Sequence, residues 1–122
     1  MKTENKEKID LNGFTGTENY YRASLFGELK VTDGVQYLRT EGNCYWLTDI
    51  IFSYQPKLKQ QDFQVWKLNK YGTKGWMVSC EDGDYNILIS QFLEYSDFEE
   101  QTGLTEVTIW VENDVAMLPS ER

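Results

Sequence analysis

The stretch from residue 62 to residue 80 reads Asp62-Phe-Gln-Val-Trp-Lys-Leu-Asn-Lys-Tyr-Gly-Thr-Lys-Gly-Trp-Met-Val-Ser-Cys80. Residues 62–69 and 76–80 are rich in amino acids that favour β-strands, and the segment 71–75 between them supplies two glycines for a turn. This arrangement predicts two antiparallel strands joined as a hairpin. Because a hairpin must bury one of its faces, the rest of the fold depends on what covers that face.

Two further strands are expected after the hairpin. An Asp-Gly pair at residues 82–83 favours a tight turn, and the segment that follows places Tyr85, Ile87 and Ile89 on one face. Residues 107–112 alternate in the same way. Since consecutive strands usually lie beside one another, the sequence predicts an antiparallel meander of three to four strands.

Two short helices are expected before the hairpin. Residues 32–34 offer an N-cap for the first helix, which ends at Gly42. Asn43 can cap the second helix, which Pro56 ends. The second helix carries an apolar stripe of Trp46, Leu47, Ile50, Ile51 and Tyr54. We expect both helices to pack on one face of the meander, so the predicted fold class is α+β. The expected sheet partners of the stripe are Tyr85, Ile87, Ile89 and Val107.

The length of 122 residues fits one domain. We expect residues 1–12 to form a flexible N-terminal arm and residues 13–122 to form a single globular domain. Residues 1–10 alternate lysines with acidic residues and lack the apolar core of a signal peptide, which favours a cytoplasmic location. No apolar run approaches the ~20 residues of a spanning helix, so no membrane partner is expected.

The charge of the chain is polarised along the sequence. The net charge is −8, and residues 75–121 hold 11 acidic and no basic side chains. Residues 57–74 hold five lysines and one acidic residue, which can neutralise part of that charge if the fold brings the two segments together. The acidity either keeps the protein soluble or attracts a basic partner surface, in the manner of a nucleic-acid backbone. Direct nucleic-acid binding is not expected, because the cationic cluster is short.

The chemistry that the sequence allows is limited. Histidine is absent, which removes the commonest general base and zinc ligand. Cys44 and Cys80 lack the spacing of a zinc or redox motif and are expected to be reduced structural thiols. The acidic segments 81–84 and 97–100 could hold a metal or divide acid and base roles, but solvated turns are the alternative for both. No catalytic residue, cofactor or metal site is expected.

Three aromatic residues are candidate anchors for a partner. Trp110 shares a strand face with Thr108 and Glu112, which favours partial exposure. Tyr20 and Tyr21 lie in an aromatic segment that resembles a loop or an edge element. Large flat side chains dominate binding hot spots, although packing in the core is the alternative for each of them.

Several segments together resemble a known family. These segments are residues 14–22 (Phe-Thr-Gly-Thr-Glu-Asn-Tyr-Tyr-Arg), Asp33-Gly34-Val35, Tyr45-Trp46-Leu47, Val65-Trp66-Lys67-Leu68, Tyr95-Ser96-Asp97-Phe98 and Leu118-Pro119-Ser120-Glu121-Arg122. The family is an uncharacterised bacterial domain of unknown function, with small members often found in cyanobacteria and on mobile elements. The resemblance implies no activity, but a mobile-element setting favours a protein that blocks a host-defence complex.

We therefore expect a small acidic, non-enzymatic protein that binds a basic site on a protein partner. An inhibitor of a nucleic-acid-processing or host-defence complex, similar to anti-CRISPR proteins, would fit this description. The expected acidic face consists of Glu81, Asp82, Asp84, Asp97, Glu99 and Glu100. One alternative is a small-molecule or divalent-metal-dependent enzyme that uses carboxylates and tyrosines, and another is a structural subunit of an assembly. The pattern predicts no particular oligomeric state.

Overall fold

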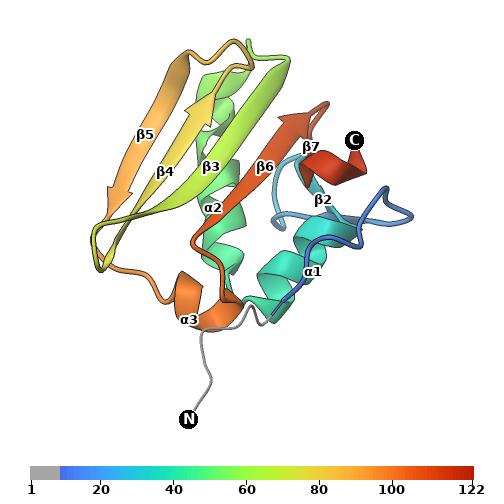
Figure 1. The fold of residues 1–122 in the computed structure, drawn as a ribbon. Helices are drawn as coiled ribbons and strands as arrows, with labels where there is room; N and C mark the ends of the chain where they lie inside the picture. Colours follow the sequence, from blue (N-terminus) through green and yellow to red (C-terminus); the bar gives the residue numbers. More distant parts are fainter. Residues whose placement is uncertain (1–8) are drawn as a thin grey trace.

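The hairpin of strands β3 (Phe63–Tyr71) and β4 (Gly75–Glu81) lies inside a larger sheet (Figure 1). The structure is a computed structural model that describes residues 9–122. The two strands pair antiparallel from Val65 opposite Glu81 to Tyr71 opposite Gly75. Gly72 in the turn has a φ of 78°, a left-handed conformation that favours glycine.

The sheet is larger than the sequence predicted. Within residues 9–122 it has seven strands in the order β1-β2-β7-β6-β3-β4-β5, and β2 pairs with β7 in parallel. The additional strands are β1 (Tyr20–Arg22), β2 (Lys30–Thr32), β5 (Ile87–Leu93), β6 (Glu106–Glu112) and β7 (Val115–Met117). The predicted antiparallel meander of three to four strands is therefore wrong, although the fold does mix helices and strands. Strands of three residues, such as β1, β2 and β7, are too short to show an alternating pattern.

The position of β6 is the main difference in topology. A meander would place β6 beside β5, but β6 pairs antiparallel with β3, from Phe63 opposite Glu112 to Asn69 opposite Glu106. The connection between β5 and β6 contains the short helix α3 (Phe98–Thr102) and passes below the end of the sheet (Figure 1). Strand β5 is consequently left at the edge.

The helices cover one face of the sheet. Helix α2 (Tyr45–Tyr54) lies behind β3 and β4 in Figure 1 and continues into the 3-10 helix η1 (Gln55–Leu58), while α1 (Asp33–Glu41) packs near β2. Leu47 and Ile51 of α2 lie against the inner face of β3, β4 and β6. The buried side chains of that face include Trp66, Leu68, Trp76, Val78, Val107 and Ile109.

Part of the expected core is exposed. Tyr85 and Ile87 are 84% and 66% exposed, whereas Ile89 is only partly buried. Tyr85 has a φ of 69° in the turn after β4, and the pairing register shifts between Cys80 and Glu81, so the first residues of the β5 region turn away from the helices. Trp46 and Ile50 of the helical stripe are likewise only half-buried.

The N-terminal arm falls mostly on residues 1–8, which lie outside the described part of the chain. Of the residues that follow, Ile9 is buried, and its backbone N–H donates to the Thr102 carbonyl over 3.4 Å. Asn43 has a φ of 51°, and Cys44 instead occupies the N-cap of α2. Within residues 9–122, no helix is both long and apolar enough to cross a membrane.

A buried carboxylate fastens the end of the chain to the start of α1. Glu121, in the 3-10 helix η2 (Pro119–Glu121), accepts hydrogen bonds from the Thr32 hydroxyl at 2.6 Å and the Gly34 N–H at 2.9 Å. It also accepts one from the Leu118 N–H at 3.0 Å. A Cβ atom at position 34 would lie 2.6 Å from the Glu121 carboxylate, so glycine is required for this close approach. The segments 33–35 and 118–122 of the family resemblance thus meet in space.

We expect Glu121→Ala to lower the free energy of unfolding by about 2–4 kcal/mol, because it leaves three donors without their acceptor. Urea denaturation measures the change. The matched control is Glu41→Ala, at an exposed position, with an expected loss below about 0.5 kcal/mol. Equal midpoints for the two variants would contradict the proposed fastening.

Both cysteines are free and buried, as predicted. Burial raises the pKa of the Cys44 thiol and of the Cys80 thiol to about 12. The nearby carboxylates of Asp97 and Glu81 add to the respective shifts.

We expect neither thiol to react with a disulfide reagent in the folded protein near pH 8, because only about one thiol in 10⁴ is then ionised. As the control, both thiols should react within the mixing time when urea has unfolded the protein. Labelling is followed by absorbance at a series of urea concentrations. Fast labelling of either cysteine without urea would show that this residue is not buried.

Candidate functional site

The six acidic residues of the predicted face fall into two groups at opposite ends of β5. The turn group, Glu81, Asp82 and Asp84, lies at or near the β4–β5 turn, and the α3 group, Asp97, Glu99 and Glu100, lies in or next to α3 (Figure 1). Strand β5 has seven residues and therefore separates the two groups by roughly 20 Å. The two groups form no single contiguous face.

Within the turn group, the three side chains have different roles. Asp82 accepts hydrogen bonds from the Asn86 amide at 3.0 Å and from the Asp84 N–H at 2.8 Å, which together lower the pKa of Asp82. Asp82 therefore shapes the turn. Glu81 pairs with Lys67 over 3.2 Å, whereas the Asp84 side chain is exposed and makes no ion pair within the described chain.

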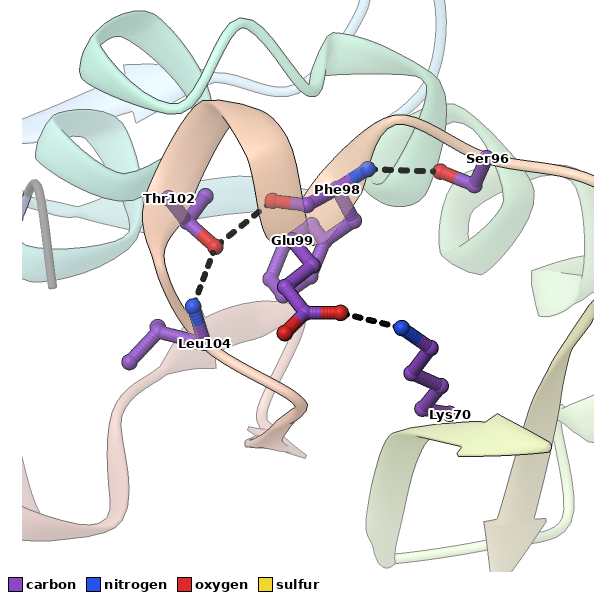
Figure 2. Close-up of polar contacts among 6 residues, drawn as sticks. All are labelled: Lys70, Ser96, Phe98, Glu99, Thr102 and Leu104. Carbon is purple, nitrogen blue, oxygen red and sulfur yellow. Dashed lines mark hydrogen bonds and ion pairs between the residues drawn. The ribbon is translucent and has the colours of Figure 1, made fainter. Parts of the chain in front are cut away.

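Figure 2 shows how α3 is fixed beneath the sheet. The Phe98 N–H donates to the Ser96 hydroxyl at 3.1 Å, and the Thr102 hydroxyl donates to the Phe98 carbonyl at 2.7 Å. Glu99 forms an ion pair with Lys70 at the end of β3. The buried Phe98 ring packs edge-on against Trp76, with centroids 5.3 Å apart. Helix α3 is thus anchored to β3 by Glu99 and to β4 by Phe98.

The carboxylates of the α3 group differ in how free they are. Glu99 is held by Lys70, and Asp97 accepts a hydrogen bond from the Gln101 amide at 3.2 Å. Glu100 is exposed and makes no ion pair within residues 9–122. The lysines of segment 57–74 therefore neutralise one member of each group. Carboxylates without an ion-pair partner in the described chain therefore remain at both ends of β5.

The sequence predicted strand β5 but not its position at the edge of the sheet. Its sequence, Ile-Leu-Ile-Ser-Gln-Phe-Leu, has no charge and no proline, and among the described residues it pairs only with β4. The opposite edge, β1, has only three residues and includes Arg22. On an edge strand, alternate backbone N–H and C=O groups point away from the sheet without partners. Glu94 follows β5 directly and is exposed, so the edge has acidic residues at both ends.

The open face of the sheet beside β5 carries exposed aromatic residues. Phe92 is 50% exposed and contacts Tyr71 edge-on, with ring centroids 5.9 Å apart. The Phe92 ring lies over Gly75, where a Cβ atom would approach it to 2.8 Å. Tyr95 is also exposed just beyond the strand. This end of the edge therefore offers an apolar surface as well as free backbone groups.

The predicted aromatic anchors lie elsewhere. Trp110 is on the open face of β6 and packs against Phe63, with ring centroids 5.3 Å apart, and against the Arg122 guanidinium. Tyr20 and Tyr21 lie on β1, at the edge of the sheet opposite β5. Tyr20 is exposed, but Tyr21 is half-buried. The structure does not bring these residues together with either acidic group.

Tyr21 holds its segment to the start of α1. Its hydroxyl donates to Asp33 over 3.0 Å, and the Glu18 N–H donates to the same carboxylate over 2.9 Å. Donation from Glu18, and then from Tyr21 and Asn19, lowers the pKa of Asp33. The pKa of Tyr21 is raised, mainly because its hydroxyl donates a hydrogen bond to Asp33 and to a lesser extent because the residue is partly buried. One further segment of the family resemblance, residues 14–22, therefore also contacts the segment 33–35.

We expect this contact to be lost in acid. Because the pKa of Asp33 is lower in the folded chain than in the unfolded one, its contribution is present above about pH 4 and disappears as the pH falls through the lowered value. The amide resonance of residue 18, measured by NMR between neutral and strongly acidic pH in a Glu18→Gln background that removes the residue's own carboxyl, should report that titration. With Asp33→Asn added to that background the resonance should stay constant, while a resonance that titrates at an ordinary aspartate pKa would rule out the contact.

A cavity in the described part of the chain lies away from β5. It has a volume of about 530 Å³ and lies between η1, the β6–β7 turn and the loop before β2. Its lining includes the buried Gln64, whose amide makes a reciprocal pair of 2.9 Å hydrogen bonds with Gln55. Asp62, Asp114 and Lys59 also line it, but no tyrosine of residues 9–122 does. Among those residues, no three Cys, Asp or Glu side chains are grouped closely enough to hold a metal ion.

The fold defines an α+β protein with one helix-covered and one open sheet face, whose distinguishing surface is an uncharged edge strand between carboxylates. The chain belongs to the family described as "Family of unknown function (DUF6876)", whose profile matches residues 5–122. Searches of curated proteins and of solved structures gave no significant match.

Proposed function

We propose that the protein is a non-enzymatic interaction protein that binds a basic site on a protein partner at the β5 edge. The observation that carries the proposal is the uncharged strand β5 with free acidic side chains at both of its ends. An unprotected edge of seven residues is rare in a protein that has no use for it, because it invites pairing with other chains.

The charges define the kind of partner. Asp84, Glu94 and Glu100 are exposed and belong to a chain of net charge −8, so they attract lysine- and arginine-rich surfaces and repel phosphates. Complementary charge mainly accelerates association and excludes wrong partners. Direct contact with nucleic acid or with a membrane is not part of the proposal.

A complex that processes nucleic acids would offer such a basic surface. The resemblance to small bacterial proteins of cyanobacteria and mobile elements supports inhibition of a host-defence complex as the biological role. Two unpaired cysteines support a cytoplasmic location, because thiols stay reduced in that compartment.

The cavity favours a second candidate, the binding of a small molecule. A volume of about 530 Å³ lies within the usual range of ligand sites. If this candidate were a divalent-metal-dependent enzyme, the Asp62 and Asp114 carboxylates that line the cavity would have to bind the metal. Addition of calcium, magnesium or manganese should then raise the melting temperature, because a ligand of the native state stabilises it by mass action.

A structural subunit of a larger assembly would instead form a stable oligomer in light scattering.

The main test compares two triple variants of equal charge. Asp84→Lys, Glu94→Lys and Glu100→Lys together reverse the charge beside β5, whereas Glu18→Lys, Glu28→Lys and Glu41→Lys reverse exposed charges elsewhere. The partner is first captured from native-host lysate on the wild-type protein and identified by mass spectrometry. Its association rate is then measured by stopped flow at low and high salt.

We expect the variant beside β5 to associate about 10- to 1,000-fold more slowly at low salt and to lose most of its salt dependence. The control variant should retain most of the wild-type association rate and most of its salt dependence. Equal rates for the two variants would contradict a site at β5, and a captured partner with an acidic surface would contradict the proposal as a whole.

A further inference from the structure

We infer that β5 recognises its partner by strand addition: an extended segment with lysine or arginine on both sides of about seven uncharged residues pairs with the free backbone of β5. This inference rests on the proposed function and adds to it the conformation and the composition of the bound segment. The length follows from the seven residues of β5, of which the regular part from Ile89 to Leu93 would pair with the partner strand one for one.

The backbone of β5 is regular enough to accept another strand. A register shift lies between Cys80 and Glu81, where Cys80 pairs with Ile89 and Glu81 pairs with Ile87. The irregularity thus affects only the first residues of β5. From Ile89 to Leu93 the pairing with β4 advances one residue at a time, and the outer edge of this part is free within the described chain. Edge strands are usually protected by charges, prolines, short length, β-bulges or covering segments, and within the described chain the part of β5 from Ile89 to Leu93 has none of these.

The side chains of β5 require an uncharged partner. An added strand places alternate side chains on the two faces of the sheet. On the open face these would lie beside Ser90 and Phe92, and on the helix-covered face beside Ile89, Gln91 and Leu93. Apolar and small polar side chains of the partner strand suit both faces of the sheet. An unpaired charge on either face would be desolvated without compensation.

The ends of β5 require a basic partner and disfavour a second copy of this chain. Asp84 precedes the strand and Glu94 follows it. Antiparallel pairing of two copies about Ser90 would bring Glu94 of one copy near Asp84 of the other, in a dimer whose chains each carry a net charge of −8. Lysine or arginine at both ends of an incoming segment would instead meet these carboxylates in either strand direction.

The first arm of the test selects the segment. A displayed peptide library with seven randomised uncharged positions, flanked by either two lysines or two glutamates on each side, is selected on the full-length protein. We expect lysine-flanked peptides with alternating β-branched or aromatic residues to be enriched. Enrichment of glutamate-flanked peptides, or of lysine-flanked peptides regardless of the central residues, would overturn the inference.

The second arm tests the backbone contact. The best peptide is synthesised with N-methyl groups on alternate central residues, in two versions that differ by one position. The version that blocks the N–H groups facing β5 should bind at least about 10-fold more weakly than the other, because only it removes strand hydrogen bonds. The unmodified peptide should also slow amide exchange within residues 87–93, whereas exchange in β1 serves as the control. Equal binding of the two versions would overturn strand addition.

The outcomes separate the two proposals. Binding of lysine-flanked peptides that depends on Asp84 and Glu94, but not on N-methylation or central sequence, would refute strand addition and leave the proposed function intact. Binding of no lysine-flanked peptide, together with unchanged association of the Asp84, Glu94 and Glu100 variant with the captured partner, would refute both. A dimer in light scattering that dissociates in Phe92→Lys would replace the partner strand with a second copy.

Discussion

The antiparallel ladder between β3 and β6 is the interaction on which the rest of the structure depends. It brings Trp66 opposite Ile109 and Leu68 opposite Val107, all of them buried beneath α2. Because β6 occupies this side of β3, it can also present its other edge to β7, and β7 in turn pairs with β2. The same choice leaves β5 without a second neighbour, so the exposed edge is a direct consequence of how the core is assembled.

This topology also explains why α3 is so firmly held. The chain must leave β5, pass the ends of β4 and β3, and enter β6, a distance of three strand spacings or roughly 14 Å. Phe98 anchors the crossing in the core between Trp46 and Trp76, and the Glu99 ion pair with Lys70 attaches it to β3. The acidic residues of α3 are thus partly structural, and only the exposed Glu100 is wholly free for a partner.

Local signals predicted the separate elements better than their arrangement. The β3–β4 hairpin, α1, α2 and the strand nature of β5 and β6 all follow from periodicity and turn residues. The pairing of β6 with β3 does not follow from these local signals. The alternating residues of β6 fit β5 and β3 equally well, and which of the two strands β6 joins depends on the packing of the whole core. Acidic clusters could be seen in the sequence, but their separation by β5 and their partial neutralisation by Lys67 and Lys70 required the fold.

The unprotected edge and the strong acidity are best understood together. A seven-residue edge without charges would normally promote association of identical chains. Carboxylates at both ends, Asp84 and Glu94, oppose that association without occupying the edge itself. A lysine within the strand would have protected β5 as well, but it would also have blocked any partner. In the proposed binding mode, placing the protective charge outside the strand keeps the backbone available and favours segments whose ends carry the opposite charge.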